Sequence, residues 1–468
     1  MLFNSFAFIT LLICTFILYY QIKLAKYQIQ ILVLSSLIFY AYDQPELVLL
    51  LLFSAGLNVT VSYYIVNGLT SRKKLLATIG IILNLSALAF FKYSPLISST
   101  LFPQDGSVAR FLVNIPLPIG ISFFTFEGIS LLIDVYNEKY FDNKKLFPVS
   151  FREHAQRTLF FISFFPHLVA GPILKAHDFY PQIGVKKYSE INWEQSFKNL
   201  VIGYFLKMVV ADNLKDYTFG IAYPFFEKES TLTLITMLFG YSFQIFADFA
   251  GYSLIAIGLA KLFGYNFNEN FNFPYISSSF KEFWKRWHIS LSSFLMEYLY
   301  FPLGGNKKGK VRTYVNLMIT MILGGLWHGA AISYAVWGAF HGLALALERF
   351  ITDKIKINET PLITVVKTIF VFFSVTLAWL LFKLPEFDHV IKYLQSIANN
   401  YNLKNDYKLI TYILMYSSIV IFYHAAHLYF RNRSVPKVQH FDYVAYALML
   451  FLIMTNSGSS GSFIYFQF

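Results

Sequence analysis

Charged residues are scarce in this sequence: Asp, Glu, Lys and Arg make up 14% of the 468 residues, whereas 56% are hydrophobic. Apolar stretches long enough to cross a bilayer recur from end to end, and no stretch is polar enough to form a separate soluble domain. We therefore predict an all-α polytopic membrane protein, because a helix satisfies its own backbone hydrogen bonds within the lipid. The first apolar run lacks a basic start and a small-residue cleavage site, so we expect it to remain as a transmembrane helix.

Cysteine is almost absent. The single residue, Cys14, excludes a disulfide framework and any multi-cysteine metal site, and we expect neither a metal nor a permanently bound cofactor. The net charge of +12 does not point to nucleic acid, because no basic soluble domain is present to carry such contacts. In a membrane protein an excess of Lys and Arg is typical of cytoplasmic loops beside anionic lipid.

The positions of Lys and Arg predict the orientation of the chain. Basic loops at 21–27, 67–74, 137–157 and 261–312 place these segments in the cytoplasm and the N-terminus outside. We predict about 11 transmembrane helices, drawn from spans near 2–20, 28–41, 45–66, 75–91, 111–136, 199–223, 231–260, 313–347, 363–382, 408–428 and 441–455. The segment 158–174, interrupted by Pro166, Gly171 and Pro172, is predicted to be re-entrant. Residues 456–468 then form an extracytoplasmic tail.

The segment 280–295 has the periodicity of an amphipathic helix. Aromatic and aliphatic residues recur on one face, and basic and polar residues on another; the first group is Phe280, Trp284, Trp287, Leu291 and Leu295, and the second is Lys281, Lys285, His288 and Ser292. This pattern predicts a helix lying in the membrane interface. The block that follows, 313–347, is short for two full crossings, so we expect its turn, around Gly324-Gly325 and Gly329, to lie within the bilayer.

His328 is the leading candidate for chemistry. It lies in the block Thr313 to Leu347, which contains no Asp, Glu, Lys or Arg, and ionisable side chains at membrane depth are costly and usually functional. A packing histidine bonded to a neighbouring helix is the alternative interpretation. His288, on the interfacial segment, is a weaker candidate by itself, because such helices often carry a histidine with no catalytic part.

Eight stretches together resemble the membrane-bound O-acyltransferase family, in particular its bacterial branch for alginate and peptidoglycan O-acetylation and D-alanyl transfer to teichoic acids. They are LPIGISFFTFEGISLLIDVY (117–136), FFPHLVAGPIL (164–174), DFAGYSLIAIGLAKLFGY (248–265), NFNFPYISSSFKEFWKRWHISLSSFLMEYLY (270–300), LGGN (303–306), LGGLWHG (323–329), WGAFHG (337–342) and FIYFQF (463–468). The pair RWHISLS and GGLWHG is highly specific. Similar proteins carry polar residues where this sequence has Ala250 and Leu254, and often proline where it has Ser462.

The resemblance implies roles for individual residues. His328 would be the general base, since acyl transfer from a thioester to a hydroxyl needs a neutral base and an apolar setting disfavours imidazolium. His288 would face the same channel and orient the thioester or polarise its carbonyl. Tyr465 in the tail would be an acyl relay, although an aromatic membrane anchor is the alternative. Asp248 and Trp327 are supporting candidates.

Other polar residues have more ordinary interpretations. Asp248 and Glu127 could form a proton path, but a structural hydrogen bond to a facing helix is the commoner use of such carboxyl groups. His167 and His341 are assigned packing roles. The basic group Lys307, Lys308, Lys310 and Arg312 could attract coenzyme A phosphates, or could simply mark a cytoplasmic loop.

The predicted function is O-acetyl transfer. A single integral-membrane domain spanning 1–468, in the bacterial cytoplasmic membrane, would take acetyl from a cytoplasmic thioester, acetyl-CoA, for O-acetylation of a cell-envelope or exported polysaccharide. The expected partners are the acyl-CoA donor, membrane lipids, and an extracytoplasmic serine hydrolase-like (SGNH-type) acetyltransferase that meets the polysaccharide. The alternatives are a membrane transporter using His328, His288 and Asp248 as a proton relay, and a non-catalytic assembly scaffold.

Overall fold

The fold is described by a computed structural model that covers residues 1–468 apart from 104–105, 139–141, 356–357, 359, 432–438, 460, 462 and 464–468. Within these described residues every regular element is helical and no strand occurs. The prediction of an all-α protein is confirmed. The chain divides into two compact units, one formed by residues 1–197 and 256–268 and the other by 198–255 and 269–468.

The first unit contains the N-terminal helices. They are α1 (Phe6–Tyr19), α2 (Gln28–Ala41), α3 (Val48–Val66), α4 (Lys73–Leu101), α5 (Ser107–Val113), α6 (Ile121–Asn137), α7 (Asn143–Leu146), α8 (Phe151–Ser163), α9 (Phe165–Leu168) and α10 (Ala176–Phe179). Helix α6 packs against α3 and α4, and Gly128 allows this approach because a Cβ there would lie 2.5 Å from the side-chain nitrogen of Asn58. A buried pair of amides, Asn58 and Asn84, joins α3 to α4.

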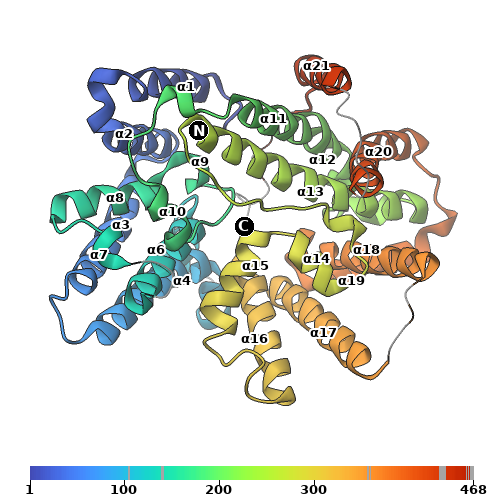
Figure 1. The fold of residues 1–468 in the computed structure, drawn as a ribbon. Coiled ribbons are helices and arrows are strands. Elements are labelled where there is room, and N and C mark those ends of the chain that lie inside the picture. The colour runs from blue at the N-terminus through green and yellow to red at the C-terminus, as the bar shows by residue number, and fades with distance from the viewer. Residues whose placement is uncertain are drawn as a thin grey trace. The chain divides into compact units, whose positions relative to one another are not determined.

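The second unit holds the predicted site. It contains most of α13 (Thr231–Leu262), which continues into the first unit, and α14 (Phe280–Arg286), α15 (Ile289–Leu295), α16 (Lys310–His328), α17 (Ile332–Lys354), α18 (Pro361–Lys383), α19 (Phe387–Asn399), α20 (Tyr407–Phe430) and α21 (Gln439–Thr455). Helix α11 (Trp193–Tyr204) leads through a π-helical segment, η5 (Phe205–Ala211), into α12 (Asp212–Thr218). Helices α16 and α17 lie side by side (Figure 1).

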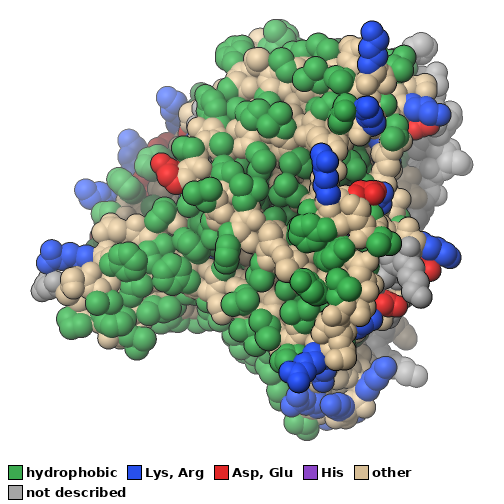
Figure 2. Space-filling view, turned by 90° about the vertical axis from the view of Figure 1, so that its left-hand side faces the viewer, with side chains coloured by type: hydrophobic (Ala, Val, Ile, Leu, Met, Phe, Trp, Pro, Cys, Tyr) green, Lys and Arg blue, Asp and Glu red, His purple; other side chains and the backbone are tan. Residues whose placement is uncertain are grey.

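The surface and the helix lengths fit a multi-pass membrane protein. Among the described residues, six helices are long and apolar enough to cross a bilayer: Ile22–Ala41, Pro45–Val66, Lys73–Ser98, Thr231–Leu262, Pro361–Lys383 and Tyr407–Phe430. Two shorter apolar helices are Phe6–Tyr19 and Asp442–Thr455. On the face drawn in Figure 2 hydrophobic side chains dominate, and Lys and Arg gather toward its edges. Such apolar exposure is what lipid contact requires.

Several elements differ from the sequence-based prediction: α4 extends to Leu101, beyond the predicted span 75–91, and the predicted crossing 199–223 is divided among α11, η5 and α12. The span predicted at 111–136 is two helices, because α5 ends at Val113 and α6 begins at Ile121. Pro116 and Pro118 lie in the connection, where they cannot donate helical hydrogen bonds. Helix α19 is not predicted from the sequence: its residues lie between the predicted spans 363–382 and 408–428.

The predicted interfacial helix is also corrected. Residues 280–295 form two short helices, α14 and α15, which are separated at Trp287 and His288. His288 has a positive φ of 43°, a backbone conformation that costs energy for any residue other than glycine. The buried Trp287 packs against Trp379 of α18, with ring centroids 4.9 Å apart. Packing against α18 therefore outweighs the helical periodicity at this point.

The uncharged block 313–347 forms parts of two helices joined by a short turn. Helix α16 ends at His328, and α17 begins at Ile332, so Gly329 lies in the turn as expected. Gly324 and Gly325, which were also predicted near the turn, instead lie within α16. Segment 158–174 contains no continuous long helix, because α8 ends at Ser163 and α9 covers only Phe165–Leu168. Its re-entrant path stays a prediction.

Candidate active site

His328 is the last residue of α16 and is 3% exposed. Its imidazole is surrounded by aromatic rings, with centroids 5.0 Å from Phe382 and 5.3 Å from Trp337. This position is a consequence of the tight turn between α16 and α17, which brings both helices close to the ring. The ring of His328 therefore lies among aromatic side chains at the end of α16.

The amide side chain of Asn270 contacts His288. The Oδ1 atom of Asn270 accepts from the backbone N–H of Ser290 at 3.2 Å and from its hydroxyl at 2.9 Å, and lies 3.1 Å from Nδ1 of His288. Because the backbone N–H can only donate, the contacted atom must be the amide oxygen, so Nδ1 of His288 carries the proton. In the neutral ring Nε2 is then the nitrogen that can accept a proton.

The two histidines are neighbours. Their ring centroids are 6.4 Å apart, and the indole of Trp327 lies against both, 5.9 Å from His288 and 5.0 Å from His328. His288 is 1% exposed and packs edge-on against Phe249 at 4.6 Å. The structure thus brings together three of the residues selected from the sequence.

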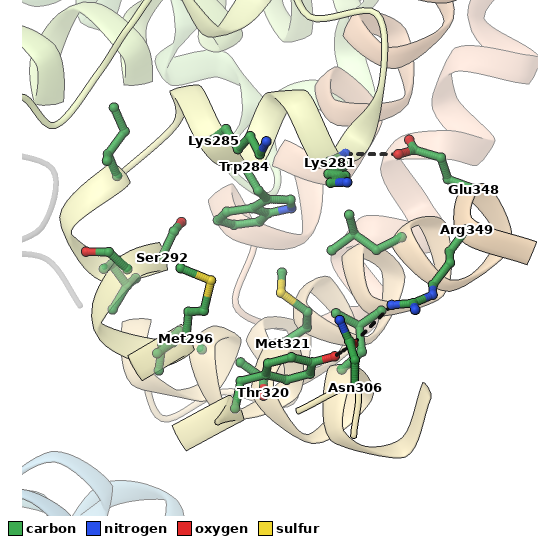
Figure 3. A pocket seen from close by; sticks show the side chains of 18 of the residues that line it. Lys281, Trp284, Lys285, Ser292, Met296, Asn306, Thr320, Met321, Glu348 and Arg349 are labelled. Carbon is green, nitrogen blue, oxygen red and sulfur yellow. Dashed lines mark hydrogen bonds between the residues drawn. The ribbon is translucent and has the colours of Figure 1, made fainter. Parts of the chain in front are cut away.

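A cavity of about 680 Å³ opens beside His328. Apolar side chains from α15, α16 and α17 form much of its wall, and Lys281, Lys285 and Arg349 also line it (Figure 3). Glu348 of α17 accepts from the backbone N–H groups of Phe280 at 2.5 Å and Lys281 at 3.2 Å. This contact fixes the start of α14 to α17, and so fixes the position of the two lysines.

Comparison of the sequence with known protein families identifies one match. The family model described as "MBOAT, membrane-bound O-acyltransferase family" matches residues 2–385. The chain belongs to that family. It is therefore a multi-pass membrane enzyme, an O-acyltransferase, and the resemblance noted from the sequence is confirmed.

Several relatives of this O-acyltransferase are named for a polymer that they modify. It is 35% identical to the probable alginate O-acetylase AlgI of Pseudomonas aeruginosa, over 82% of this chain and 72% of that one. It is 34% identical to the peptidoglycan O-acetyltransferase of Helicobacter pylori, over 78% and 73%. Identity to the teichoic acid D-alanyltransferase of Bacillus subtilis is 26%, over 70% and 82%.

The other predicted residues of the O-acyltransferase are not among those that line this cavity, or they lie outside the described part. Asp248 on α13 lies 2.7 Å from the ammonium of Lys207. Glu127 on α6 lies 2.7 Å from Nδ1 of His167 on α9, both fully buried, and His341 packs between Trp284 and Trp337. Tyr465 is outside the described residues.

Sequence reasoning missed Asn270 and Lys207. Asn270 opens the stretch 270–300 that carried much of the family resemblance, but no periodicity distinguishes it from neighbouring polar residues. The sequence does carry a signal for Lys207: it is the only charged residue between Lys198 and Asp212, the same kind of isolation that identifies His328. The basic residues that line the cavity are Lys281, Lys285 and Arg349. They are not the group at 307–312 that the sequence offered as a possible site for coenzyme A phosphates.

Proposed function

We propose that this O-acyltransferase takes an acetyl group from a cytoplasmic thioester, acetyl-CoA, and delivers it across the bacterial cytoplasmic membrane for O-acetylation of a cell-envelope or exported polysaccharide. The names of the relatives support a polysaccharide acceptor, since alginate and peptidoglycan O-acetylation are each represented at about the same identity. Acetyl is favoured over D-alanyl because the D-alanyl transferase is the more distant relative.

The cavity beside His328 is the observation that carries this proposal. Its apolar wall suits an acyl group and the chain that bears the thioester. Its cations Lys281, Lys285 and Arg349 outnumber its carboxylates Glu348 and Asp353, which suits the phosphates of a nucleotide donor. Arg349 is oriented by Asn306, whose side-chain oxygen accepts from it at 3.1 Å (Figure 3). A single cavity thus combines a candidate base with groups that would bind an anionic thioester.

The chemistry needs one base and one acid step. A hydroxyl attacks the thioester carbonyl while His328 accepts its proton, and a C–O bond forms. Collapse of the tetrahedral intermediate breaks the C–S bond, and the thiolate that leaves takes the proton from the imidazolium. His288 would stabilise the developing charge only in its protonated form, because Nδ1–H is already bonded to Asn270 and Nε2 of the neutral ring carries no proton. The net reaction moves acetyl from sulfur to oxygen and releases a free thiol.

The first acceptor in this proposal is Tyr465. Its phenol would receive acetyl as an aryl ester and pass it to the serine of an extracytoplasmic hydrolase-like partner, which then esterifies the polymer. The described part of the tail supports this route, because Phe463 is buried beside Phe249, and Phe249 packs on His288. Tyr465→Phe would separate the relay from a membrane anchor, since only a relay requires the hydroxyl.

The test is acetyl transfer by His328→Ala. Loss of general base catalysis should lower the rate by about 10²–10⁴-fold, measured as cleavage of labelled acetyl-CoA by purified protein and as acetylation of polymer in cells. His389→Ala is the control, because His389 lies on α19 and stacks on Tyr223 instead of lining the cavity. Wild-type rates from His328→Ala would refute the catalytic assignment.

The same assay separates an enzyme from a transporter. An acetyltransferase releases free thiol from acetyl-CoA, whereas a transporter using the buried histidines as a proton relay would move substrate without cleaving the thioester. Substrate flux with no thiol release would overturn the proposed function.

A further inference from the structure

Lys207 forms a buried ion cluster that the reaction described above does not use. It belongs to the π-helical segment η5, and its Nζ lies 2.7 Å from Oδ1 of Asp212 and 2.7 Å from Oδ1 of Asp248 on α13. All three side chains are buried. Burying charges at membrane depth is costly even when they are paired, so the cluster needs an explanation beyond stability.

The C-terminal tail runs along this cluster. The ammonium of Lys207 also lies 3.4 Å from the carbonyl oxygen of Gly461, and the N–H of Gly458 donates to the carbonyl of Met208, also in η5, at 3.0 Å. Three side chains of α12 extend the contact: Asn213 to the carbonyl of Asn456, Lys215 to the carbonyl of Ser459, and Asp216 to the hydroxyl of Ser459. These contacts join η5 and α12 to the tail between 456 and 461.

The fit between tail and helix is close. A Cβ at Gly458 would lie 2.4 Å from the backbone nitrogen of Asn213, a separation that backbone atoms cannot relieve without moving the tail. Most of the contacts use backbone atoms of the tail, so they hold its path and not particular side chains. The tail is thus seated on η5 and α12 like a bound peptide.

Beyond this seat the tail reaches the candidate active site. The ring of Phe463 stacks on Tyr252 at 4.6 Å and lies 5.5 Å from Phe249, and Phe249 packs edge-on against His288. Both rings come from α13, the helix that also carries Asp248. The ion cluster and the aromatic contact are therefore two points on one path that leads the tail toward His288.

We propose that Lys207 is a positioning residue: bridging Asp212 and Asp248, it docks the C-terminal tail on η5 and α12 so that Phe463 is seated on Tyr252 and Phe249 beside His288. The docking itself stands on these contacts alone. Its effect on acetyl transfer rests on the proposed function, in which the tail supplies the first acceptor.

Docking can be measured without any activity. In a Cys14→Ser background, Asp216→Cys and Ser459→Cys place two thiols where a side-chain contact now exists, and mild oxidation should join them. Adding Lys207→Met should slow disulfide formation by about tenfold or more, because a released tail has a lower effective concentration at its seat. Gel filtration checks that the variant remains folded. Equal rates of disulfide formation in the folded Lys207→Met variant and in the parent that retains Lys207 would overturn the proposal.

A second variant avoids altering buried charge. Gly458→Ala should slow the same disulfide, because its Cβ meets backbone, whereas Gly184→Ala, another loop glycine whose Cβ would meet no atom within 4 Å, should not. An undiminished rate in Gly458→Ala would contradict the docked path.

An activity assay tests whether docking of the tail is needed for acetyl transfer. Because the proposed first acceptor, Tyr465, belongs to the tail, Lys207→Met should lower acetyl-CoA cleavage and polymer acetylation together, and the oxidised 216–459 disulfide should restore the lost transfer by holding the tail in place. No restoration in a folded, cross-linked variant would show that Lys207 acts otherwise. If the unaltered protein itself transfers no acetyl, the proposed function fails, and the disulfide rates still decide the docking.

Discussion

Asn270 is the residue through which the fold orients His288. Its side-chain oxygen gathers the Nδ1 proton of His288 and two donors of Ser290, while its amide nitrogen donates to Ser253 on α13 at 3.1 Å. A ring held in this way presents Nε2 in a fixed direction. The same oxygen thereby determines the tautomer of His288 and holds the first turn of α15. An apolar residue of similar size at position 270 could do neither.

Replacing Asn270 should therefore impair transfer without preventing donor binding. We expect Asn270→Leu, which is similar in size but cannot accept a hydrogen bond, to lower kcat on the order of 10–100-fold, the range for outer partners that orient a functional histidine. Asn270→Asp keeps the acceptor and should retain more activity. The measurement is kcat and KM for acetyl-CoA, with His288→Ala as the comparison. A loss confined to KM, or equal loss in both Asn270 variants, would speak against an orienting role.

The packing of helix α16 against α17 controls the position of His328. Two glycines allow α16 and α17 to approach closely: a Cβ at Gly325 would lie 2.2 Å from the carbonyl oxygen of Tyr334, and one at Gly338 would lie 2.3 Å from that of Met321. Small residues at helix contacts are a common means of close packing in membranes. Since His328 ends α16, any separation of this pair also moves the ring.

Gly338→Ala should destabilise the protein and reduce transfer together. The added methyl group meets backbone on the facing helix, and overpacking of this kind costs about 1–3 kcal/mol. Gly342→Ala, one turn along α17, is the matched control, since the nearest atom to its Cβ would be the sulfur of the flexible Met318 side chain, with Cβ of Met321 3.3 Å away and no backbone atom among the nearest three. Thermal unfolding in detergent compares the two. A melting temperature for Gly338→Ala at or above that of Gly342→Ala would contradict close packing as the reason for this glycine.

Orientation in the membrane is a property of the whole molecule, and the distribution of Lys and Arg along the chain predicts it. Segments carrying Lys187 and Lys308 should be cytoplasmic, and the tail after α21 should be outside. Such an arrangement would allow a donor to arrive from one side of the membrane and an acceptor from the other.

Cysteine labelling in intact cells checks this orientation. In a Cys14→Ser background, cysteine at position 187 or 308 should stay unlabelled by a membrane-impermeant reagent until the cells are opened, whereas Ser457→Cys should react at once. Ser457 is exposed in the structure, so lack of access would not explain a negative result. Labelling at 308 in intact cells would show that the predicted orientation is wrong.

Much of the architecture could be predicted from the sequence because its causes are local. Length and apolarity alone identify a crossing helix, and the predicted span 28–41 coincides with α2, while 363–382 and 408–428 nearly coincide with α18 and α20. The absence of charge between Thr313 and Leu347 likewise singled out His328, since a polar ring at membrane depth is costly wherever its neighbours lie. The family, too, was recognisable from short motifs read along the chain.

Only the tertiary structure decided which distant residues meet. His288 depends on Asn270, and Lys207 pairs with Asp248 while touching the carbonyl of Gly461; no periodicity relates these positions. The break at His288 shows the same limit, because the sequence predicts one continuous helix there and packing of Trp287 against Trp379 favours two. Local hydrophobicity determines that a segment is helical and in the membrane. The direction of each polar side chain depends on partners from other helices, which come together only when the chain folds.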